Sequence, residues 1–326
     1  MSANSQEGLE PGTDAASGLP AVHRSVLLNE VLEWLAPREG DVMVDGTVGA
    51  GGHAAALARR VGPLGRIVGL DRDPSMLALA AQAVRGLPVT LVHAPYSDMG
   101  EVLGGLEIPA VRGILLDLGL SSDQLAWADR GFSFAADGPL DMRFDQEGQG
   151  PTAADLVNSL GAEELANLIF ELGEERFSRR IARRIVESRR TEPIRTTRQL
   201  AELIRQSVPA TYRRGPIDPS TRTFQALRIA VNDELKRLDA LLEALPELLA
   251  PDGRVAIISF HSLEDRRVKW AFRNDPRLTV LTKKVLTATD QEVAVNPRAR
   301  SAKMRVAQRC PNQAGPNTNT NRRKPS

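Results

Sequence analysis

Cysteine is almost absent from this sequence, because Cys310 is the only one in 326 residues. A single cysteine excludes an intrachain disulfide and any metal site built from several cysteines, and it fits a reducing compartment. No other kind of metal site is predicted. No apolar run reaches the roughly 18 residues of a membrane-spanning helix, so no membrane association is expected. Together these absences favour a cytoplasmic protein.

The net charge is small, and aromatic side chains are scarce. The formal net charge is +1, since 42 Lys and Arg residues nearly balance 41 Asp and Glu residues. Any surface for nucleic acid must therefore come from local clustering of arginine rather than from overall basicity. Aromatic residues make up 4% of the chain, which argues against extensive base stacking, whereas 42% hydrophobic residues suffice for a sizeable core.

Both ends of the sequence are polar. Residues 1–20 contain Glu7, Glu10 and Asp14, no Lys or Arg, and no continuous apolar run, so a secretory signal is not expected. We expect this segment to be a flexible tail. Residues 311–326, which are rich in Asn and Pro, are predicted to form a second one.

Five short apolar runs predict strands of a parallel sheet. The runs are residues 42–44, 66–70, 89–92, 113–116 and 254–260. Each is bounded by turn signals, as is typical of strands buried on both faces. Helical segments such as 53–61 and 74–84 lie between them, the second with Asp73 as its N-cap. This alternation predicts a doubly wound, Rossmann-like α/β fold, and segments 278–287 and 302–309 predict an antiparallel hairpin at the sheet edge.

The fourth and fifth predicted strands are far apart in sequence. About 135 residues separate them, whereas a crossover in a parallel sheet needs about a dozen. The interval contains predicted helices over residues 162–172, 174–190, 197–206 and 223–249. We therefore expect residues 126–216 to be an all-helical domain, inserted into a discontinuous α/β domain of residues 21–125 and 217–310.

A glycine-rich turn follows the first predicted strand. It runs from Asp45 through Gly49, Gly51 and Gly52 to His53, and its glycines let the backbone approach a ligand closely. The turn lacks the G-x-G-x-x-G spacing of a pyrophosphate site, and an acidic residue ends the strand instead. This favours a ligand with an amino-acid end, such as S-adenosylmethionine, whose ammonium group a carboxylate holds. A nicotinamide-dependent oxidoreductase is the alternative.

Acidic residues also end the second and fourth predicted strands. Asp71 is placed to accept the hydrogens of both ribose hydroxyls, and Tyr96, after the third strand, to lie against an adenine ring. Asp117 points into the same crevice, because ligands bind outside the carboxyl ends of strands in such sheets. Three acidic strand ends beside one glycine turn therefore predict a nucleotide-type cofactor site.

Several longer motifs complete the pattern. They are residues 117–124, 130–134, 137–143, 221–228, 259–266 and 296–301. Together with His23 and the run 26–28, they resemble the bacterial ribosomal RNA small subunit methyltransferase H family, also called MraW. The resemblance extends over about residues 23–309, and the motifs are too long and too specific for chance agreement.

This resemblance implies N4-methylation, with S-adenosylmethionine, of one cytidine in the decoding region of small-subunit (16S) ribosomal RNA. It implies a methyltransferase sheet with a helical insertion, and ribosomal RNA or the assembled small subunit as partner. The family's cofactor contacts fall here on Gly51, Gly52, His53, Asp71, Tyr96, Asp117 and Gln124. A homodimer is left open. A non-catalytic, cofactor-binding ribosome assembly factor and a DNA or protein acceptor are the alternatives.

Three positions depart from the family's pattern. Phe144 stands where Met is more common, and Asp218 and Ser220 stand where His and Ala are common. These departures bear on contacts with the substrate rather than on the reaction.

The implied reaction is an in-line displacement at a sulfonium methyl, in which alignment alone contributes about 7–11 kcal/mol. A hydrogen-bond acceptor beside the cytosine amine would help to localise its delocalised lone pair. Many enzymes that methylate such amines carry Asp/Asn-Pro-Pro-aromatic after the fourth strand, where this chain has Asp117-Leu-Gly-Leu-Ser-Ser. Asp117 is the first candidate for the acceptor, unless it serves only the cofactor. Asp141 and His261 are the second candidates.

The two second candidates, Asp141 and His261, also have purely structural explanations, as do the charges that follow His261. Asp141 equally suits a turn or a helix cap, and His261 a hydrogen bond within its loop. The charges of Glu264, Asp265 and Arg266 equally suit a solvated cluster.

Arginine is concentrated between residues 176 and 214, which hold twelve arginines and three acidic residues. One predicted helix face carries Arg176, Arg179, Arg180, Arg183 and Arg184. Because the guanidinium group fits phosphate in a bidentate manner, this face is predicted to bind RNA, with a solvated charged face as the alternative. Phe132 and Phe134 could flank one extruded base or pack in the core.

Overall fold

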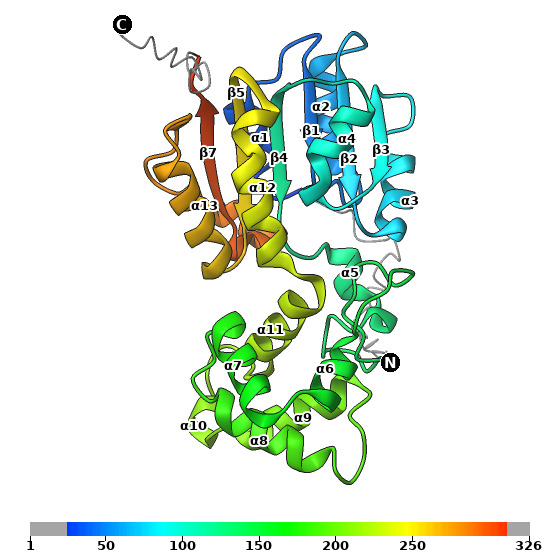
Figure 1. Ribbon diagram of the computed structural model, residues 1–326, viewed down its shortest axis with the longest axis vertical. Coiled ribbons are helices and arrows are strands. Elements are labelled where there is room, and N and C mark those ends of the chain that lie inside the picture. The colour runs from blue at the N-terminus through cyan, green and yellow to red at the C-terminus, as the bar shows by residue number, and fades with distance from the viewer. Residues whose placement is uncertain (1–24, 312–326) are drawn as a thin grey trace, which may run out of the picture.

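A seven-stranded sheet organises residues 25–311, the part of the chain that the computed structural model describes (Figure 1). The strands are β1 (Val42–Asp45), β2 (Arg66–Asp71), β3 (Val89–His93), β4 (Val111–Asp117), β5 (Leu249–Ser259), β6 (Leu278–Val280) and β7 (Lys303–Arg309). Their order is β3-β2-β1-β4-β5-β7-β6, and only the pairs that involve β7 are antiparallel. This confirms the predicted doubly wound α/β sheet with an antiparallel hairpin at its edge. The predicted tails and His23 lie outside the described residues, apart from residue 311.

Helices cover both faces of this sheet. Helices α1 (Leu28–Leu35), α2 (Gly52–Val61) and α3 (Pro74–Ala83) pack on one face, and α4 (Met99–Gly105), α12 (Glu234–Leu248) and α13 (Ser262–Asn274) on the other. The strands between them are buried on both sides, which explains their continuous apolar runs. Asp73 caps α3 as predicted, since its carboxylate accepts the Ser75 N–H at 3.0 Å. No described helix is both long and apolar enough to cross a membrane.

A second group of helices lies beyond the carboxyl ends of the strands (Figure 1). It comprises α6 (Ala153–Ser159), α7 (Ala162–Gly173), α8 (Ser178–Ser188), α9 (Thr197–Ser207), α10 (Ala210–Arg213) and α11 (Ser220–Asn232). These helices share a hydrophobic core separate from the two cores that flank the sheet. Phe224 and Leu227 of α11 belong to it, so the helical core extends past the expected end of the insertion at residue 216. The domain boundaries themselves stay a prediction.

Three predicted elements differ from the observed ones. The single helix expected over 223–249 is two helices, because Asp233 takes a left-handed conformation (φ 51°) between α11 and α12. Likewise Glu174 (φ 50°) ends α7, and α8 starts only at Ser178. The first hairpin strand is shorter than expected, since only Leu278–Val280 pairs continuously with β7 and Leu286 forms an isolated bridge.

The remaining short helices connect these layers. They are η1 (Tyr96–Asp98), α5 (Ser122–Ala126), η2 (Ala128–Arg130), α14 (Asp290–Val295) and η3 (Pro297–Ser301). Phe132, in the connection from η2 to the helical core, lies 5.2 Å from Phe144 between ring centroids, and Phe134 lies 5.0 Å from Phe224. The structure thus shows the core-packing alternative for Phe132 and Phe134.

A buried asparagine ties the helical core to the sheet. Asn232, at the end of α11, donates to the Met142 carbonyl at 2.7 Å and accepts the Phe144 N–H at 3.0 Å. Its own carbonyl accepts a hydrogen bond of 2.8 Å from Arg72, which follows β2. The break between α11 and α12 therefore lies where both halves of the molecule meet.

We expect Gly131→Ala to lower the free energy of unfolding by about 2–5 kcal/mol, through backbone strain and a clash. Gly131 has φ +73°, and an added Cβ would lie 2.2 Å from the Pro139 carbonyl oxygen. The control is Gly86→Ala, where φ is +78° but nothing lies within 4 Å, with an expected loss of about 1–2 kcal/mol. Urea denaturation of both variants measures the difference. Equal losses would mean that the clash with Pro139 is relieved without cost.

Candidate functional site

A cavity of about 860 Å³ opens at the carboxyl ends of the parallel strands. Its walls come from the turns after β1, β2, β3 and β4, from the starts of α12 and α13, and from η3. Six of the seven predicted cofactor contacts line it, namely Gly52, His53, Asp71, Tyr96, Asp117 and Gln124. The structure thus gathers these residues around one space, and their role as cofactor contacts stays a prediction.

Within the glycine-rich turn, the glycines have different roles. Gly49 (φ +51°) lines the cavity and donates its N–H to Asp71 Oδ2 at 2.9 Å. Gly51 (φ +87°) does not line the cavity. A Cβ there would lie 3.1 Å from Ala80 Cα in α3, so this glycine serves the packing of α3 against the turn.

Asp45, at the end of β1, lies beneath the turn and not at its surface. Its carboxylate is fully buried, with Oδ1 accepting the Thr47 N–H at 3.2 Å and Oδ2 without a partner among the described residues. Burial, with smaller contributions from the charges of Asp117 and Asp71, raises the pKa of Asp45 to about 7. A cationic ligand in the cavity would favour the ionised form of all three carboxylates, so the site fits a cofactor with an ammonium group and a sulfonium.

Asp71 is held in place by two backbone hydrogen bonds. Its Oδ2 accepts the Gly49 N–H and its Oδ1 accepts the Asp73 N–H, both at 2.9 Å. Each oxygen keeps a second lone pair for a ligand, as a ribose diol requires. Burial raises the pKa of Asp71 to about 6, although these two N–H groups oppose the shift.

His53 and Asp117 face each other across the first part of the cavity. His53 Nε2 lies 3.0 Å from the Val26 carbonyl, which only accepts, so Nε2 carries the hydrogen. Burial lowers the pKa of His53 to about 4, and the ring is therefore neutral near pH 7. Its Nδ1 is then an acceptor, 3.8 Å from Asp117 Oδ2. Two facing acceptors favour a ligand that brings N–H donors.

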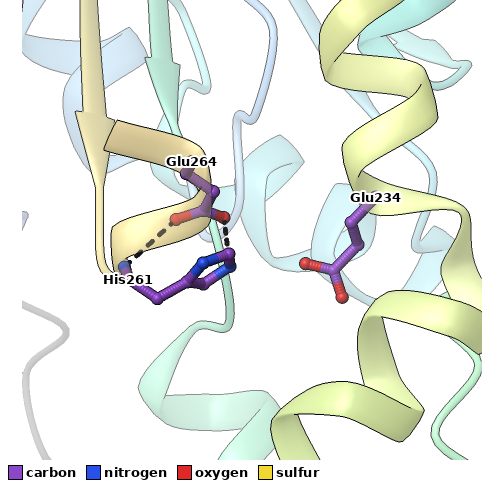
Figure 2. A group of neighbouring side chains, drawn as sticks. All are labelled: Glu234, His261 and Glu264. Atoms are coloured by element: carbon purple, nitrogen blue, oxygen red, sulfur yellow. Dashed lines mark hydrogen bonds and ion pairs between the residues drawn. The ribbon is translucent and has the colours of Figure 1, made fainter. Parts of the chain in front are cut away.

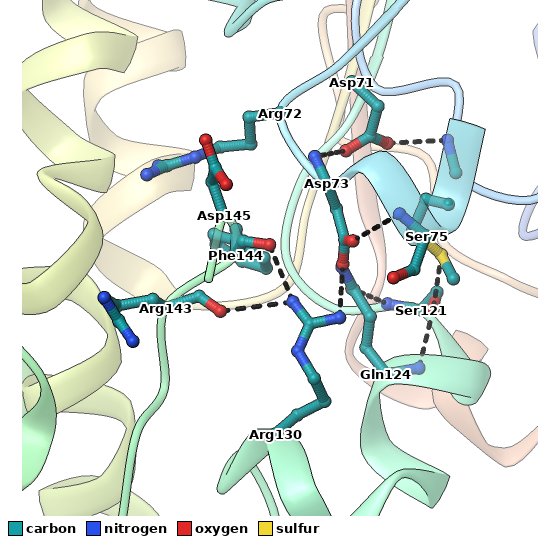
Figure 3. Close-up of polar contacts among 12 residues, drawn as sticks. Asp71, Arg72, Asp73, Ser75, Ser121, Gln124, Arg130, Arg143, Phe144 and Asp145 are labelled. Carbon is teal, nitrogen blue, oxygen red and sulfur yellow. Dashed lines mark hydrogen bonds and ion pairs between the residues drawn. The ribbon is translucent and has the colours of Figure 1, made fainter. Parts of the chain in front are cut away.

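Gln124 is held by hydrogen bonds to two other residues. Its Oε1 accepts the Ser121 N–H at 2.9 Å, and its Nε2 donates to Asp73 Oδ2 at 2.7 Å (Figure 3). The same Asp73 oxygen pairs with Arg130 at 2.9 Å, and both side chains of that pair are buried. Arg130 also donates to the Phe144 carbonyl at 2.7 Å. This network joins the turn after β2 to the loop that leads into the helical core.

Asp141 lies away from the cavity. Its carboxylate forms two hydrogen bonds of 2.8 Å with the Arg143 guanidinium, and it also accepts the Arg143 N–H at 3.0 Å. These bonds with Arg143 hold the pKa of Asp141 below its usual value, although burial opposes the shift. The structure therefore places Asp141 as the turn residue of the alternative explanation, and it does not bring Asp141 next to Asp117.

Sequence reasoning missed four charged residues that line the cavity. They are Arg72 after β2, Glu234 at the start of α12, Glu264 in the first turn of α13, and Arg298 in η3. Arg298 donates to the Leu120 carbonyl and lies over the Phe260 ring, 5.9 Å from its centroid. No spacing pointed to Glu234. Glu264 stands three residues after His261, and this capping-box spacing is the signal that could have identified it.

His261 lies between the carboxylates of Glu234 and Glu264 (Figure 2). One ligand atom from each of the three side chains lies within 4.8 Å of the others, a composition that resembles a divalent-cation site. However, both oxygens of Glu234 accept hydrogen bonds from Arg228, at 2.7 and 2.9 Å. Because this guanidinium already neutralises Glu234, we assign no metal here.

The five arginines predicted to bind RNA are all exposed. Arg179, Arg180, Arg183 and Arg184 lie on α8, opposite its buried Ile181, Ala182 and Ile185. Arg176 precedes the helix, and its guanidinium lies 4.8 Å from the ring centroids of both Phe177 and Tyr212. In Figure 1, α8 lies at the end of the molecule farthest from the sheet.

Comparison with known proteins gives consistent matches. The model of the MraW methylase family matches residues 20–310. The chain is 50% identical over 307 residues to the ribosomal RNA small subunit methyltransferase H of Syntrophotalea carbinolica, which covers 88% of this chain and 98% of that protein. The protein of the same name from Synechococcus sp. (strain JA-2-3B'a(2-13)) is 50% identical over 298 residues, covering 88% and 92%.

A solved rRNA methylase structure from Streptococcus thermophilus is a more distant match. It has a TM-score of 0.41 and 11% identity, over 87% of this chain and 93% of that chain. The family assignment therefore depends on the family model and the sequence relatives.

The raised pKa of Asp71 predicts pH-dependent cofactor binding. Because a protonated carboxyl loses acceptor capacity, we expect the affinity for S-adenosylmethionine to fall as the pH drops through about 6. Asp71→Asn should remove this step and lower the affinity at pH 7.5 by about 10–100-fold. Isothermal titration calorimetry between pH 5 and 8 measures both effects.

The control for this experiment is Asp252→Asn, a change at an exposed residue of β5 that does not line the cavity. It should leave the step near pH 6 unchanged. A contribution from Asp45 near pH 7 should remain in both variants. A step near pH 6 that persists in Asp71→Asn would mean that another group controls binding there.

Proposed function

This chain belongs to the MraW methylase family, and from that premise we propose that it is a cytoplasmic enzyme that methylates N4 of one cytidine in the decoding region of small-subunit ribosomal RNA. Membership of this family confirms the predicted relationship and S-adenosylmethionine as the cofactor. The relatives' name, ribosomal RNA small subunit methyltransferase H, supports ribosomal RNA as the acceptor. The single observation that carries the proposal is the cavity, where predicted cofactor contacts and additional carboxylates share one space.

The chain's own residues suit the parts of this cofactor. When bound, S-adenosylmethionine supplies a methyl group on a sulfonium, which departs as a neutral thioether. Asp71 accepts the ribose hydroxyls, and Tyr96, fixed by a 3.1 Å hydrogen bond from its hydroxyl to the Glu234 carbonyl, offers its ring to the adenine. Gly49 and Gly52 leave room for close approach beside the cavity.

On the side of the methyl acceptor, we assign Asp117 as the residue that accepts a hydrogen bond from the cytosine amine. As the amine nitrogen bonds to the methyl carbon, the bond from that carbon to sulfur breaks and positive charge develops on nitrogen. The Asp117 carboxylate would stabilise this charge, take up the proton that the amine loses and pass it on to water. Asp117 lines the cavity at the end of β4, and its backbone N–H donates to Thr47 Oγ1 at 2.6 Å. This bond connects the acceptor side to the glycine-rich turn, so that both substrates are held by one rigid edge of the sheet.

The decisive experiment is methyl transfer from labelled S-adenosylmethionine to small ribosomal subunits from a strain that lacks the activity. Nucleoside analysis should show N4-methylcytidine at a single mapped position. Transfer to a different acceptor would keep the cofactor and discard the substrate. Tight cofactor binding without transfer would favour a non-catalytic assembly factor instead.

Asp117→Ala should abolish transfer, with a loss of about 1,000-fold or more, because the amine loses its acceptor. The control is Asp239→Ala, which removes an exposed carboxylate that pairs with Arg267 away from this cavity. Cofactor affinity, measured in parallel, separates two roles. A loss of transfer with unchanged affinity places Asp117 on the amine, whereas a parallel loss of affinity places it on the cofactor. Near-normal transfer would remove Asp117 from the mechanism.

The exposed arginines of α8 are proposed to bind the RNA backbone. Arg179→Glu combined with Arg183→Glu should weaken binding to small subunits and lower the slope of log affinity against log salt by about one unit for each lost phosphate contact. Filter binding from about 50 to 200 mM salt measures this slope. Arg59→Glu with Arg60→Glu, an exposed pair at the end of α2, makes the same change in net charge as a control. An unchanged slope in the α8 variant would mean that these arginines form a solvated face that does not bind RNA.

A further inference from the structure

The amine side of the cavity has a second carboxylate. Strands β4 and β5 are parallel neighbours, with Asp117 opposite Ile258. The chain continues from β5 through Phe260 and His261 into α13, whose first turn carries Glu264. Asp117 and Glu264 therefore approach the same cavity from adjacent strand ends, and both line it.

Glu264 is held rigidly and remains charged. Its Oε2 accepts the backbone N–H groups of Phe260 at 2.9 Å and of His261 at 3.4 Å, and its Oε1 lies 3.1 Å from His261 Nε2. Burial alone would raise the pKa of Glu264, but the contacts with His261, Arg228 and the Phe260 N–H outweigh it and hold the pKa below its usual value. A carboxylate offers about four acceptor positions, so three contacts leave capacity for one more donor.

His261 shows that the cluster is incomplete without a ligand. Its side chain is 9% exposed, and among the described residues neither Nδ1 nor Nε2 has a partner with hydrogen-bond geometry, although Nε2 lies 3.1 Å from Glu264 Oε1. A buried polar atom without a partner is unfavourable, which is a common sign of a position that a ligand completes. Glu234, on the other side of the ring, accepts two hydrogen bonds from Arg228, whose guanidinium neutralises its charge. Glu264 has no such hydrogen bond from an arginine among the described residues, so it is the better acceptor for a further donor.

We propose that Glu264, positioned by His261, accepts a hydrogen bond from the exocyclic amine of the methyl-acceptor base and so selects cytosine over uracil. This inference rests on the proposed function and adds the group that reads the base. The amine carries two hydrogens, which allows Asp117 to accept one and Glu264 the other. Uracil presents a carbonyl oxygen at the same position, and two acceptors facing each other repel.

A bound metal cation explains the arrangement of Glu234, His261 and Glu264 less well than an amine donor does. Arg228 already supplies a positive charge to Glu234, and the remaining pair offers only one carboxylate and one imidazole. An amine donor needs only the open position on Glu264, which the cavity makes accessible.

The test compares small subunits reconstituted around transcripts with either cytidine or uridine at the methylated position, once that position is mapped. Equilibrium competition is measured with S-adenosylhomocysteine present, so that no turnover occurs. The wild-type protein should prefer the cytidine particle on the order of 10–100-fold. Glu264→Gln should reduce this ratio by about threefold or more, because an amide can also donate to the uracil oxygen, whereas Asp117 still favours the amine.

Two further variants make the result specific. Asp265→Asn changes the next carboxylate of the same helical turn, which pairs with Arg305 at 2.7 Å and does not line the cavity, and it should keep the wild-type ratio. Gln at position 264 also suits a capping box, so α13 should form. If Glu264→Gln nevertheless fails to fold, His261→Ala keeps the carboxylate and should lower the ratio by a smaller factor.

The outcomes separate this inference from the proposed function. A reduced ratio in Glu264→Gln, with cofactor affinity unchanged, supports it. An unchanged ratio would overturn this inference but would not affect the proposed methyl transfer. A tenfold loss of cofactor affinity would also overturn the inference, because it would assign Glu264 to the cofactor. A wild-type protein that neither transfers methyl groups nor prefers cytidine would overturn both.

Discussion

The parallel pairing of β1 with β2 and β4 is the constraint on which the site depends. It brings the ends of these strands to one edge of the sheet, so that Asp45, Asp71 and Asp117 lie close together. Their mutual repulsion and their burial are unfavourable in the absence of a ligand, as the raised pKa values of Asp45 and Asp71 show. A cationic cofactor relieves this repulsion. The edge is thus electrostatically incomplete by itself, and it is stable because the hydrophobic cores on both faces hold the strands in register.

A second constraint connects this edge to the helical core. Arg130 forms a buried ion pair with Asp73 and donates to the Phe144 carbonyl, while Asp73 also donates its N–H to Asp71 (Figure 3). Removal of one partner from such a pair typically destabilises a protein by about 3–5 kcal/mol, since the other charge is left buried. Asp71 and the loop that leads into the helical core are therefore connected by one network of hydrogen bonds.

Much of the sheet was predictable because its signals are local. Apolar runs bounded by turns identified the five parallel strands within a few residues, and Asp73 was recognised as a cap from its position before Pro74. Breaks in helices were not predictable in the same way. Asp233 and Glu174 themselves adopt left-handed conformations, which non-glycine residues rarely do, so their residue types did not signal the breaks.

The sequence by itself determined the fold class, the family and six of the residues that line the cavity, because strand ends in a parallel sheet meet at one edge whatever surrounds them. Only the tertiary structure decided where the other residues lie and which partners they have. Gly51 packs against α3, Gln124 supports Asp73, Asp141 pairs with Arg143, and Glu264 faces the cavity. Those roles depend on which polar atoms remain unpaired after segments distant in sequence have packed together. Local spacing carries no record of that outcome.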